Sequence, residues 1–384
     1  MPEKTYLITP GPTPVPPAVQ AAMARPLIHH RSPDFKRLFT ETLAGLKRVF
    51  MTGNDVLVIP GSGTYAMESA VANMVSPGDR VLVATAGNFG ERWQKLVTAY
   101  SAEMVLVEQP WGERLDPARV GEAAADCRVA FVTQSETSTG VVHDIRAIAD
   151  AVRPSGAALV VDAVSSLGGV ELRTDEWGID VVVSGSQKAL MCPPGLAFAS
   201  VSDRAWRLAA EGTAPRFAFD WRRIADAQAK DGTPFTPPVT IVAGLNAAIE
   251  LLERDGYEAA YTRNRGLARA TREGVKALGL EIFSPDDDTS SMVTAVRMPD
   301  DIDGQEVYTL LRDRHGVVLA GGQGPLKGRI VRIGHMGYMD RFDILTALAA
   351  LELALAEFGY RPETPGAGVA RATEVFAQSE LTRA

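Results

Sequence analysis

Short runs of apolar and β-branched residues, each followed by a turn, recur between residues 55 and 201 and mostly alternate with helix-like stretches. The runs are Asp55–Ile59, Arg80–Ala84, Met104–Glu108, Arg128–Thr133, Ala158–Asp162, Asp180–Ser184 and Leu196–Val201. This alternation predicts an α/β fold with a mostly parallel, seven-stranded sheet. The runs are continuously apolar, which is typical of strands buried on both faces.

The pattern changes after the proline-rich connection Thr233–Pro238. A long helical pattern runs from Ile241 through Leu278, with apolar residues at three- and four-residue spacing. Three shorter strands are then predicted, at Met292–Arg297, Val317–Leu319 and Ile330–Ile333. This part of the chain therefore predicts a hinge helix that leads into a smaller α+β domain.

A chain of 384 residues exceeds one typical core, so we expect more than one domain. The predicted division is an N-terminal segment at 1–20, a large domain at 21–255, a small C-terminal domain at 256–362 and a tail at 363–384. We expect loose chain at the first few residues and after Pro362.

The net charge and the cysteine content indicate which partners and which cellular environment to expect. The net charge of −8 includes no basic run, which argues against nucleic acid or an anionic membrane as a partner. The two cysteines, Cys127 and Cys192, show no metal-binding spacing and fit a reducing environment. With neither a signal-peptide pattern nor a membrane-length apolar stretch, we expect a cytoplasmic protein.

Two predicted neighbouring strands end in residues that can carry chemistry. The run Ala158–Asp162 ends in a carboxylate, and Lys188 follows the next strand among small and hydroxyl residues. Open α/β sheets bind ligands at such strand ends. Pyridoxal phosphate chemistry needs this pair, since the lysine bonds to the cofactor aldehyde and the aspartate pairs with the ring nitrogen. Taken singly, a surface lysine and a helix-capping aspartate are the more common interpretations.

Other strand ends carry weaker signals for the same crevice. The loop Pro60–Thr64 precedes a predicted helix and can cradle a phosphate, although a plain strand-to-helix turn has the same sequence. Phe89 lies between glycines, where it can lie flat on a cofactor ring or pack in the core. The hydroxyls of Ser135–Gly140 can bind a phenolic oxygen or cap the next helix.

Arg332 is the candidate for binding a substrate carboxylate. It lies on a predicted strand, three positions after Arg329, so the two side chains point to opposite faces. A guanidinium matches a carboxylate in geometry. A structural ion pair with an Asp or Glu is the competing interpretation.

Ordered motifs along the chain, up to about Tyr360, resemble the class V, fold-type I pyridoxal-phosphate aminotransferases. The similarity is greatest to the group of alanine–glyoxylate and serine–glyoxylate aminotransferases. The motifs are Thr9–Thr13, Gly61–Gly63, Glu136–Gly140, Val161–Gly169, Ser184–Lys188 and Arg332–Gly337.

The resemblance implies pyridoxal 5′-phosphate as cofactor, with Lys188 and Asp162 as catalytic residues. It also implies a homodimer with shared active sites, in which Thr236 reaches the cofactor phosphate of the neighbouring subunit. Arg332 would bind the substrate carboxylate. The implied cofactor-binding residues are Ser62, Gly63, Thr64, Phe89, Thr137, Asp162, Val164, Gln187, Lys188 and Thr236.

The implied activity is a ping-pong transamination from a small amino acid, alanine or serine, to glyoxylate. Departures from the family pattern are Phe89 in place of Trp, Thr64 in place of His and Thr233 in place of Tyr. Ureidoglycine–glyoxylate or aspartate specificity is an alternative within the transaminases. A lyase or desulfurase of the same fold and a non-catalytic subunit are further alternatives, and Gln187 argues against the desulfurase because those enzymes usually have His there.

Overall fold

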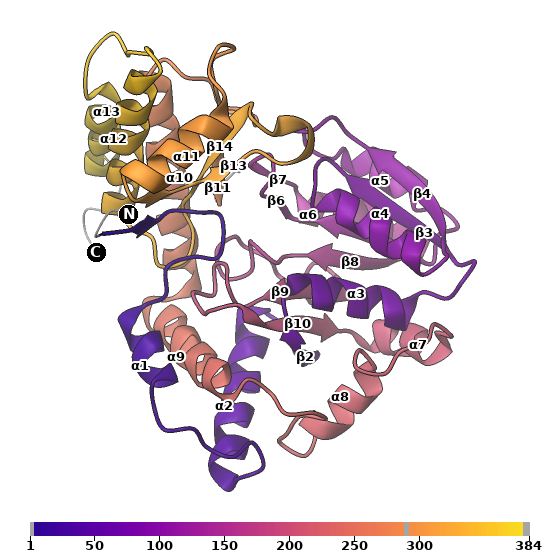
Figure 1. The fold of residues 1–384 in the computed structure, drawn as a ribbon. Coiled ribbons are helices and arrows are strands. Elements are labelled where there is room, and N and C mark those ends of the chain that lie inside the picture. Colours follow the sequence, from indigo (N-terminus) through magenta and orange to yellow (C-terminus); the bar gives the residue numbers. More distant parts are fainter. Residues whose placement is uncertain (1–3, 288–291, 379–384) are drawn as a thin grey trace.

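A computed structural model describes residues 4–287 and 292–378 and contains the predicted seven-stranded sheet (Figure 1). The strand order is β2-β10-β9-β8-β5-β3-β4, and only β10 runs against its neighbours. Each of the seven strands of this sheet begins and ends within two residues of its predicted bounds. The strands are β2 (Asp55–Gly61), β3 (Arg80–Thr85), β4 (Glu103–Glu108), β5 (Val129–Thr133), β8 (Ala158–Asp162), β9 (Val181–Gly185) and β10 (Gly195–Val201).

Helices cover both faces of this sheet, because alternate residues of each strand enter two different cores. In β3, Leu82 joins one core while Val81 and Val83 join the other. The first core includes α1 (Pro17–Met23), α2 (Pro33–Val49), α5 (Pro117–Ala123), α6 (Ile145–Val152) and α9 (Val239–Asp255). The second includes α3 (Gly63–Met74), α4 (Gly90–Ala99), α7 (Asp203–Glu211) and α8 (Trp221–Gln228).

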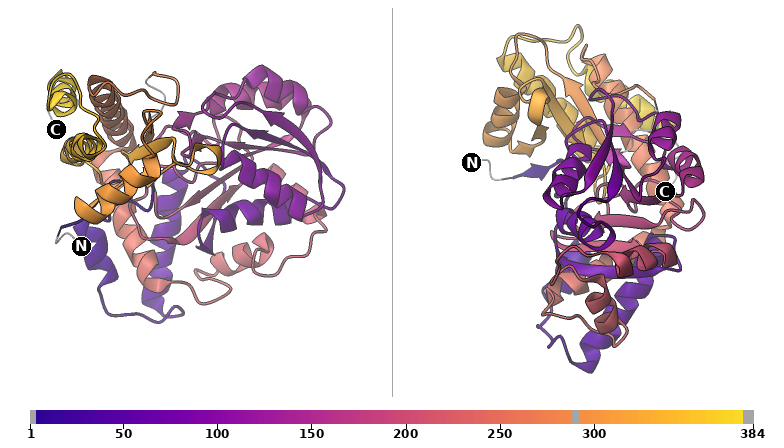
Figure 2. Two further views of the ribbon diagram at one scale, coloured as in Figure 1. Left: turned by 45° about the horizontal axis from the view of Figure 1, so that its top comes forward. Right: turned by 90° about the vertical axis from the view of Figure 1, so that its right-hand side faces the viewer.

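A smaller antiparallel sheet lies to one side of the large one (Figures 1 and 2). Its order is β11-β14-β13, from Val293–Arg297, Ile330–Gly334 and Ala320–Gly321. The helices α10 (Tyr257–Ala277), α11 (Gly304–Arg314), α12 (Arg341–Glu357) and α13 (Ala367–Gln378) share a separate apolar core with it. Two short ladders complete the topology, β1–β12 (Tyr6–Leu7 with Val317–Val318) and β6–β7 (Ser135–Glu136 with Val141–Val142).

Three predictions for the C-terminal half need correction. The helical pattern from Ile241 to Leu278 is not one helix, because α9 ends at Asp255 and the φ of 87° at Gly256 interrupts the helical backbone before α10. The strand predicted at Val317–Leu319 pairs in parallel with β1, which the sequence did not predict. Met292 precedes β11, which begins at Val293.

The expectation of loose chain after Pro362 is wrong for most of that segment. Residues 367–378 form α13, whose Ala372, Val375 and Phe376 are buried against the small-sheet core. Its apolar stripe has a partner in α10, so burial stabilises the helix. The N-terminal residues 1–3 and the C-terminal residues 379–384, for which loose chain was also expected, lie outside the described residues.

The sheet brings the predicted chemical groups to one edge. Strands β8 and β9 are adjacent and parallel, with Asp162 opposite Val183, so Asp162 and the segment after β9 leave the sheet side by side. This agrees with the prediction that Asp162 and Lys188 leave neighbouring strand ends. Within the described ranges, no helix is long and apolar enough to cross a membrane.

The crossing of α10 and α13 provides a test of the packing. A side chain at Gly274 would overlap Leu348 and would lie 2.9 Å from the Gly368 carbonyl. We expect Gly274→Val to lower the free energy of unfolding by about 2 kcal/mol through overpacking, measured as a lower urea midpoint. Ala259→Val, on the exposed side of the same helix, is the control. Equal midpoints for the two variants would contradict the close crossing.

Candidate active site

A cavity of about 190 Å³ lies at the carboxyl ends of the parallel strands. Eight predicted site residues line it: Ser62, Gly63, Thr64, Phe89, Asp162, Val164, Gln187 and Lys188. Met67, Arg92, Ser135 and Ser165 complete the lining. The structure thus brings together residues that span more than 120 positions of sequence.

Lys188 extends its amine into this cavity from the segment after β9. Its Nζ donates to the Pro10 carbonyl at 2.8 Å, and Gly11 packs so closely on the lysine stem that a side chain there would overlap it. Burial lowers the pKa of Lys188 to about 8, and the nearby positive charge of Arg332 adds to this. A substantial fraction of the amine is therefore neutral at weakly alkaline pH, and a neutral amine is a nucleophile and a base.

Asp162 ends β8 and is almost fully buried. Burial raises the pKa of Asp162 to about 6, although its Oδ1 accepts a hydrogen bond of 2.8 Å from the Val164 amide and Arg92 attracts it. The carboxylate is consequently still ionised at neutral pH. An ionised carboxylate in a buried place can hold a protonated ring nitrogen.

The N-terminus of α3 offers donors for an anion. Helix α3 begins at Gly63, and the Ser62 side chain does not cap it. Gly63 packs directly on Val164, where a side chain would overlap. The uncapped amides and the helix dipole favour a phosphate group at this end of the cavity.

Two further polar groups lie in the same cavity. Arg92 donates to Thr64 Oγ1 at 3.0 Å. The Oε1 atom of Gln187 is buried without a hydrogen-bond partner among the described residues. A buried amide oxygen without a donor is costly, so the site fits a ligand that supplies one.

Glu136 organises the wall that contains Phe89. Its buried carboxylate accepts hydrogen bonds from the amides of Phe89 and Gly90 at 3.0 and 2.9 Å. It also accepts from the amide and hydroxyl of Ser138 at 3.1 and 2.5 Å. Burial raises the pKa of Glu136, while these hydrogen bonds oppose the rise. These hydrogen bonds fix the strand-to-helix turn that carries Phe89. The Arg92 guanidinium lies over the Phe89 ring, with its carbon 4.8 Å from the ring centre.

Arg332 and Thr137 do not line the cavity itself but lie together beside it. Arg332, only 6% exposed, donates from Nη1 to the Thr137 carbonyl at 2.8 Å and from Nε to the Gly321 carbonyl at 2.9 Å. Burial lowers the pKa of Arg332 to about 10, and Glu136 opposes this. Among the described residues, no carboxylate oxygen lies within 4.0 Å of Arg332, so the competing interpretation as a structural ion pair finds no support.

Thr236 also does not line the cavity. It is exposed on the connection between α8 and α9, and its reach toward a neighbouring subunit stays a prediction. The sequence reasoning missed Met67 and Arg92. Each lies three positions after a predicted residue, Thr64 and Phe89 respectively, and such spacing along a helix start places side chains on one face.

Residues 5–344 match the family model Aminotransferase class-V. The chain is 44% identical to the "Soluble hydrogenase, small subunit" of Synechococcus sp. (strain PCC 6716), over 98% of this chain and 99% of that protein. It is 34% identical to the serine–glyoxylate aminotransferase of Methylorubrum extorquens, over 100% and 98% of the two chains.

Among solved structures, the ureidoglycine–glyoxylate aminotransferase of Bacillus subtilis superposes with a TM-score of 0.92 at 31% identity, over 98% of this chain and 99% of that one. These matches confirm the resemblance that the ordered motifs indicated, including the fold-type I architecture. The chain therefore belongs to the class V aminotransferases, a family of transaminases that generally depend on pyridoxal phosphate.

Proposed function

We propose that this protein binds pyridoxal 5′-phosphate and transfers the amino group of a small amino acid, alanine or serine, to glyoxylate by a ping-pong mechanism. The observation that carries the proposal is the convergence of the Lys188 amine, the Asp162 carboxylate and the α3 N-terminus on one cavity. Proteins similar to this chain use glyoxylate according to their names, which supports the choice of acceptor.

The residues present fit the cofactor. The amides at the start of α3, with Ser62 and Thr64, would hold the phosphate, and Gln187 carries a buried oxygen for which the described part of the chain supplies no donor. Phe89 and Val164 would enclose the ring, Thr137 would touch its phenolic side and Asp162 would pair with its nitrogen. When bound, the cofactor supplies the aldehyde that takes up the amino group and a ring that accepts electrons.

Lys188 would move the proton at the substrate Cα. Its pKa of about 8 leaves a substantial fraction of the amine neutral at weakly alkaline pH, and the neutral amine can accept a proton as a general base. Asp162 would keep its negative charge on the opposite side of the site. Because their environments differ, Lys188 would carry the proton and Asp162 would remain a fixed negative charge.

Arg332 would bind the carboxylate shared by amino acid and keto acid. The two carbonyls that it contacts fix the plane of the guanidinium and leave other N–H donors available. Arg92 is the only arginine among the described residues that line the cavity, and it donates to Thr64. Since Arg92 belongs to the wall that would hold the cofactor, the choice of alanine or serine as donor rests on the similarity to a serine–glyoxylate aminotransferase.

The cysteines weigh against the desulfurase alternative. Both thiols are buried, and burial raises the pKa of Cys192 to about 12. Neither cysteine lines the cavity. A desulfurase requires an ionisable, accessible thiol at the substrate, so transamination is the better interpretation.

We also propose a cytoplasmic homodimer in which Thr236 completes the neighbouring site. Phe235 precedes Thr236 in sequence, and its exposed ring lies 5.7 Å from the exposed ring of Phe217, so apolar surface beside Thr236 is available to a partner subunit. Light scattering would measure the subunit number.

Lys188→Ala tests the catalytic assignment. We expect the transamination rate to fall by about 10³-fold or more, because no other amine among the described residues lines the cavity to move the proton. Lys47→Ala, on the exposed surface of α2, is the control and should keep the wild-type rate. Appreciable turnover by Lys188→Ala would refute the role.

Arg332→Lys tests the carboxylate contact. We expect roughly a tenfold or greater increase in KM for both the amino acid and glyoxylate, since a lysine keeps the charge but loses the planar pair of donors. Steady-state kinetics with each substrate varied in turn would measure it. Unchanged KM values would make Arg332 a structural residue.

The pKa of Lys188 can be measured in the cofactor-free protein through its carbamylation by cyanate. Reactivity should reach half its maximum near pH 8, because only the neutral amine reacts and burial has lowered its pKa. Peptide mass spectrometry would follow the modification. In Arg332→Gln the midpoint should move to higher pH, since a neighbouring positive charge has been removed. A midpoint near the value of a lysine in water, about 10.4, would contradict the described environment.

A further inference from the structure

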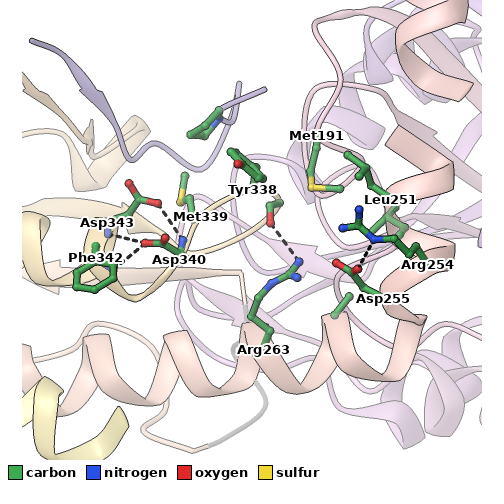
Figure 3. Close-up of a pocket in the computed structure, with 14 residues that line it drawn as sticks. Met191, Leu251, Arg254, Asp255, Arg263, Tyr338, Met339, Asp340, Phe342 and Asp343 are labelled. Atoms are coloured by element: carbon green, nitrogen blue, oxygen red, sulfur yellow. Dashed lines mark hydrogen bonds and ion pairs between the residues drawn. The ribbon is translucent and has the colours of Figure 1, made fainter. Parts of the chain in front are cut away.

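A second and larger cavity, of about 460 Å³, lies outside the active site. It is lined mainly by the end of α9, the first two turns of α10 and the segment that leads into α12, and it is open to solvent (Figure 3). It shares no lining residue with the active-site cavity. Its volume lies in the range of about 300–1,000 Å³ that is typical of sites for small organic ligands.

Much of this cavity is apolar. Its apolar wall consists of Pro14, Met191, Leu251, Leu252, Ala260, Tyr338, Met339 and Phe342. Tyr338 and Phe342 are 49% and 67% exposed, which is unusual for large aromatic side chains and leaves apolar surface open to a ligand.

Arg263 brings a positive charge into this apolar space. Its side chain rises from α10 toward the Gly337 carbonyl, which accepts from Nη2 at the long distance of 3.3 Å (Figure 3). Its Nε is buried without a partner, and within the described parts of the chain no carboxylate oxygen lies within 4.0 Å. Burial lowers the pKa of Arg263, and Asp255 opposes this from a greater distance. A guanidinium with so few partners is costly in a largely buried position.

The acidic residues around the cavity are already engaged. Asp255 pairs with Arg254 at 3.0 Å. Asp340 caps α12 by accepting from the amides of Phe342 and Asp343, and the Asp343 carboxylate accepts from the Asp340 amide at 2.9 Å. The charge of Arg263 is therefore left without an ionic partner among the groups that line the cavity.

We propose that this cavity binds a small organic anion, a monocarboxylate with a short apolar chain. The carboxylate would pair with Arg263, and the chain would lie against Met191, Leu251 and Met339. Carboxylates match the guanidinium fork, and the apolar wall matches an aliphatic chain. This inference does not depend on the proposed transamination.

The cavity lies one residue layer from the catalytic lysine. The Met191 amide donates to the Lys188 carbonyl at 3.0 Å, and a side chain at Gly337 would lie 3.2 Å from that same oxygen. A ligand in this cavity would therefore contact Met191 and Gly337, which pack against the Lys188 main chain, without entering the active site.

Methionine-methyl NMR provides a test that separates the two cavities. The protein would be labelled with methyl-¹³C methionine and titrated with hexanoate, with hexanol as the uncharged probe. Met191 and Met339 line the second cavity, while Met67 lines the active site. We expect saturable shifts of the Met191 and Met339 signals with hexanoate, at concentrations that leave Met67 unchanged, and at least tenfold weaker binding of hexanol.

Two matched variants complete the test. Arg263→Gln should weaken hexanoate binding about tenfold or more, whereas Arg265→Gln, an exposed arginine two positions along the same helix, should leave it unchanged. Equal affinities of the wild-type protein for hexanol and hexanoate would overturn the proposal. This comparison uses the wild-type protein alone and so does not depend on the folding of a variant. Shifts confined to Met67, or undiminished binding by a folded Arg263→Gln, would also overturn it.

Discussion

The fold depends on holding four charged side chains in a buried place at the carboxyl edge of the large sheet. Asp162 and Glu136 accept hydrogen bonds mainly from main-chain amides, and Lys188 and Arg332 donate theirs to main-chain carbonyls, rather than pairing with an opposite charge. Buried charges are costly unless they are well hydrogen-bonded. Main-chain partners meet this requirement without neutralising the charges, which the proposed site needs at Asp162, Lys188 and Arg332.

This solution requires segments that are distant in sequence. The carbonyl that binds Lys188 comes from Pro10, and the two that bind Arg332 come from Thr137 and Gly321. The N-terminal segment, the large sheet and the small sheet must therefore all be in place before the charges are satisfied. Close approaches at Gly11 and Gly63 permit this, because a side chain at either position would overlap Lys188 or Val164. The site is thus a product of the whole chain rather than of one motif.

Much of the fold could be predicted from the sequence, because strands buried on both faces appear as continuous apolar runs. The positions of Asp162 and Lys188 at neighbouring strand ends could be predicted for the same reason, since Asp162 ends one such run and Lys188 follows the next. The break at Gly256 was missed because both helices carry the same apolar spacing on either side of it. Helix α13 was missed because its stability comes from packing against α10. Glu136 was noted only as part of a motif, and its role was not predicted because it depends on the amides of Phe89 and Gly90, which are distant in sequence.

The most direct measurement is the first half-reaction, followed by absorption spectroscopy and by chromatography of the released cofactor. The purified protein with pyridoxal phosphate would be mixed with L-alanine or L-serine in the absence of any acceptor. We expect one equivalent of pyridoxamine phosphate per subunit, and its return to pyridoxal phosphate when glyoxylate is added. A protein that binds no pyridoxal phosphate, or whose bound cofactor is changed by L-cysteine alone with release of sulfide, would contradict this expectation.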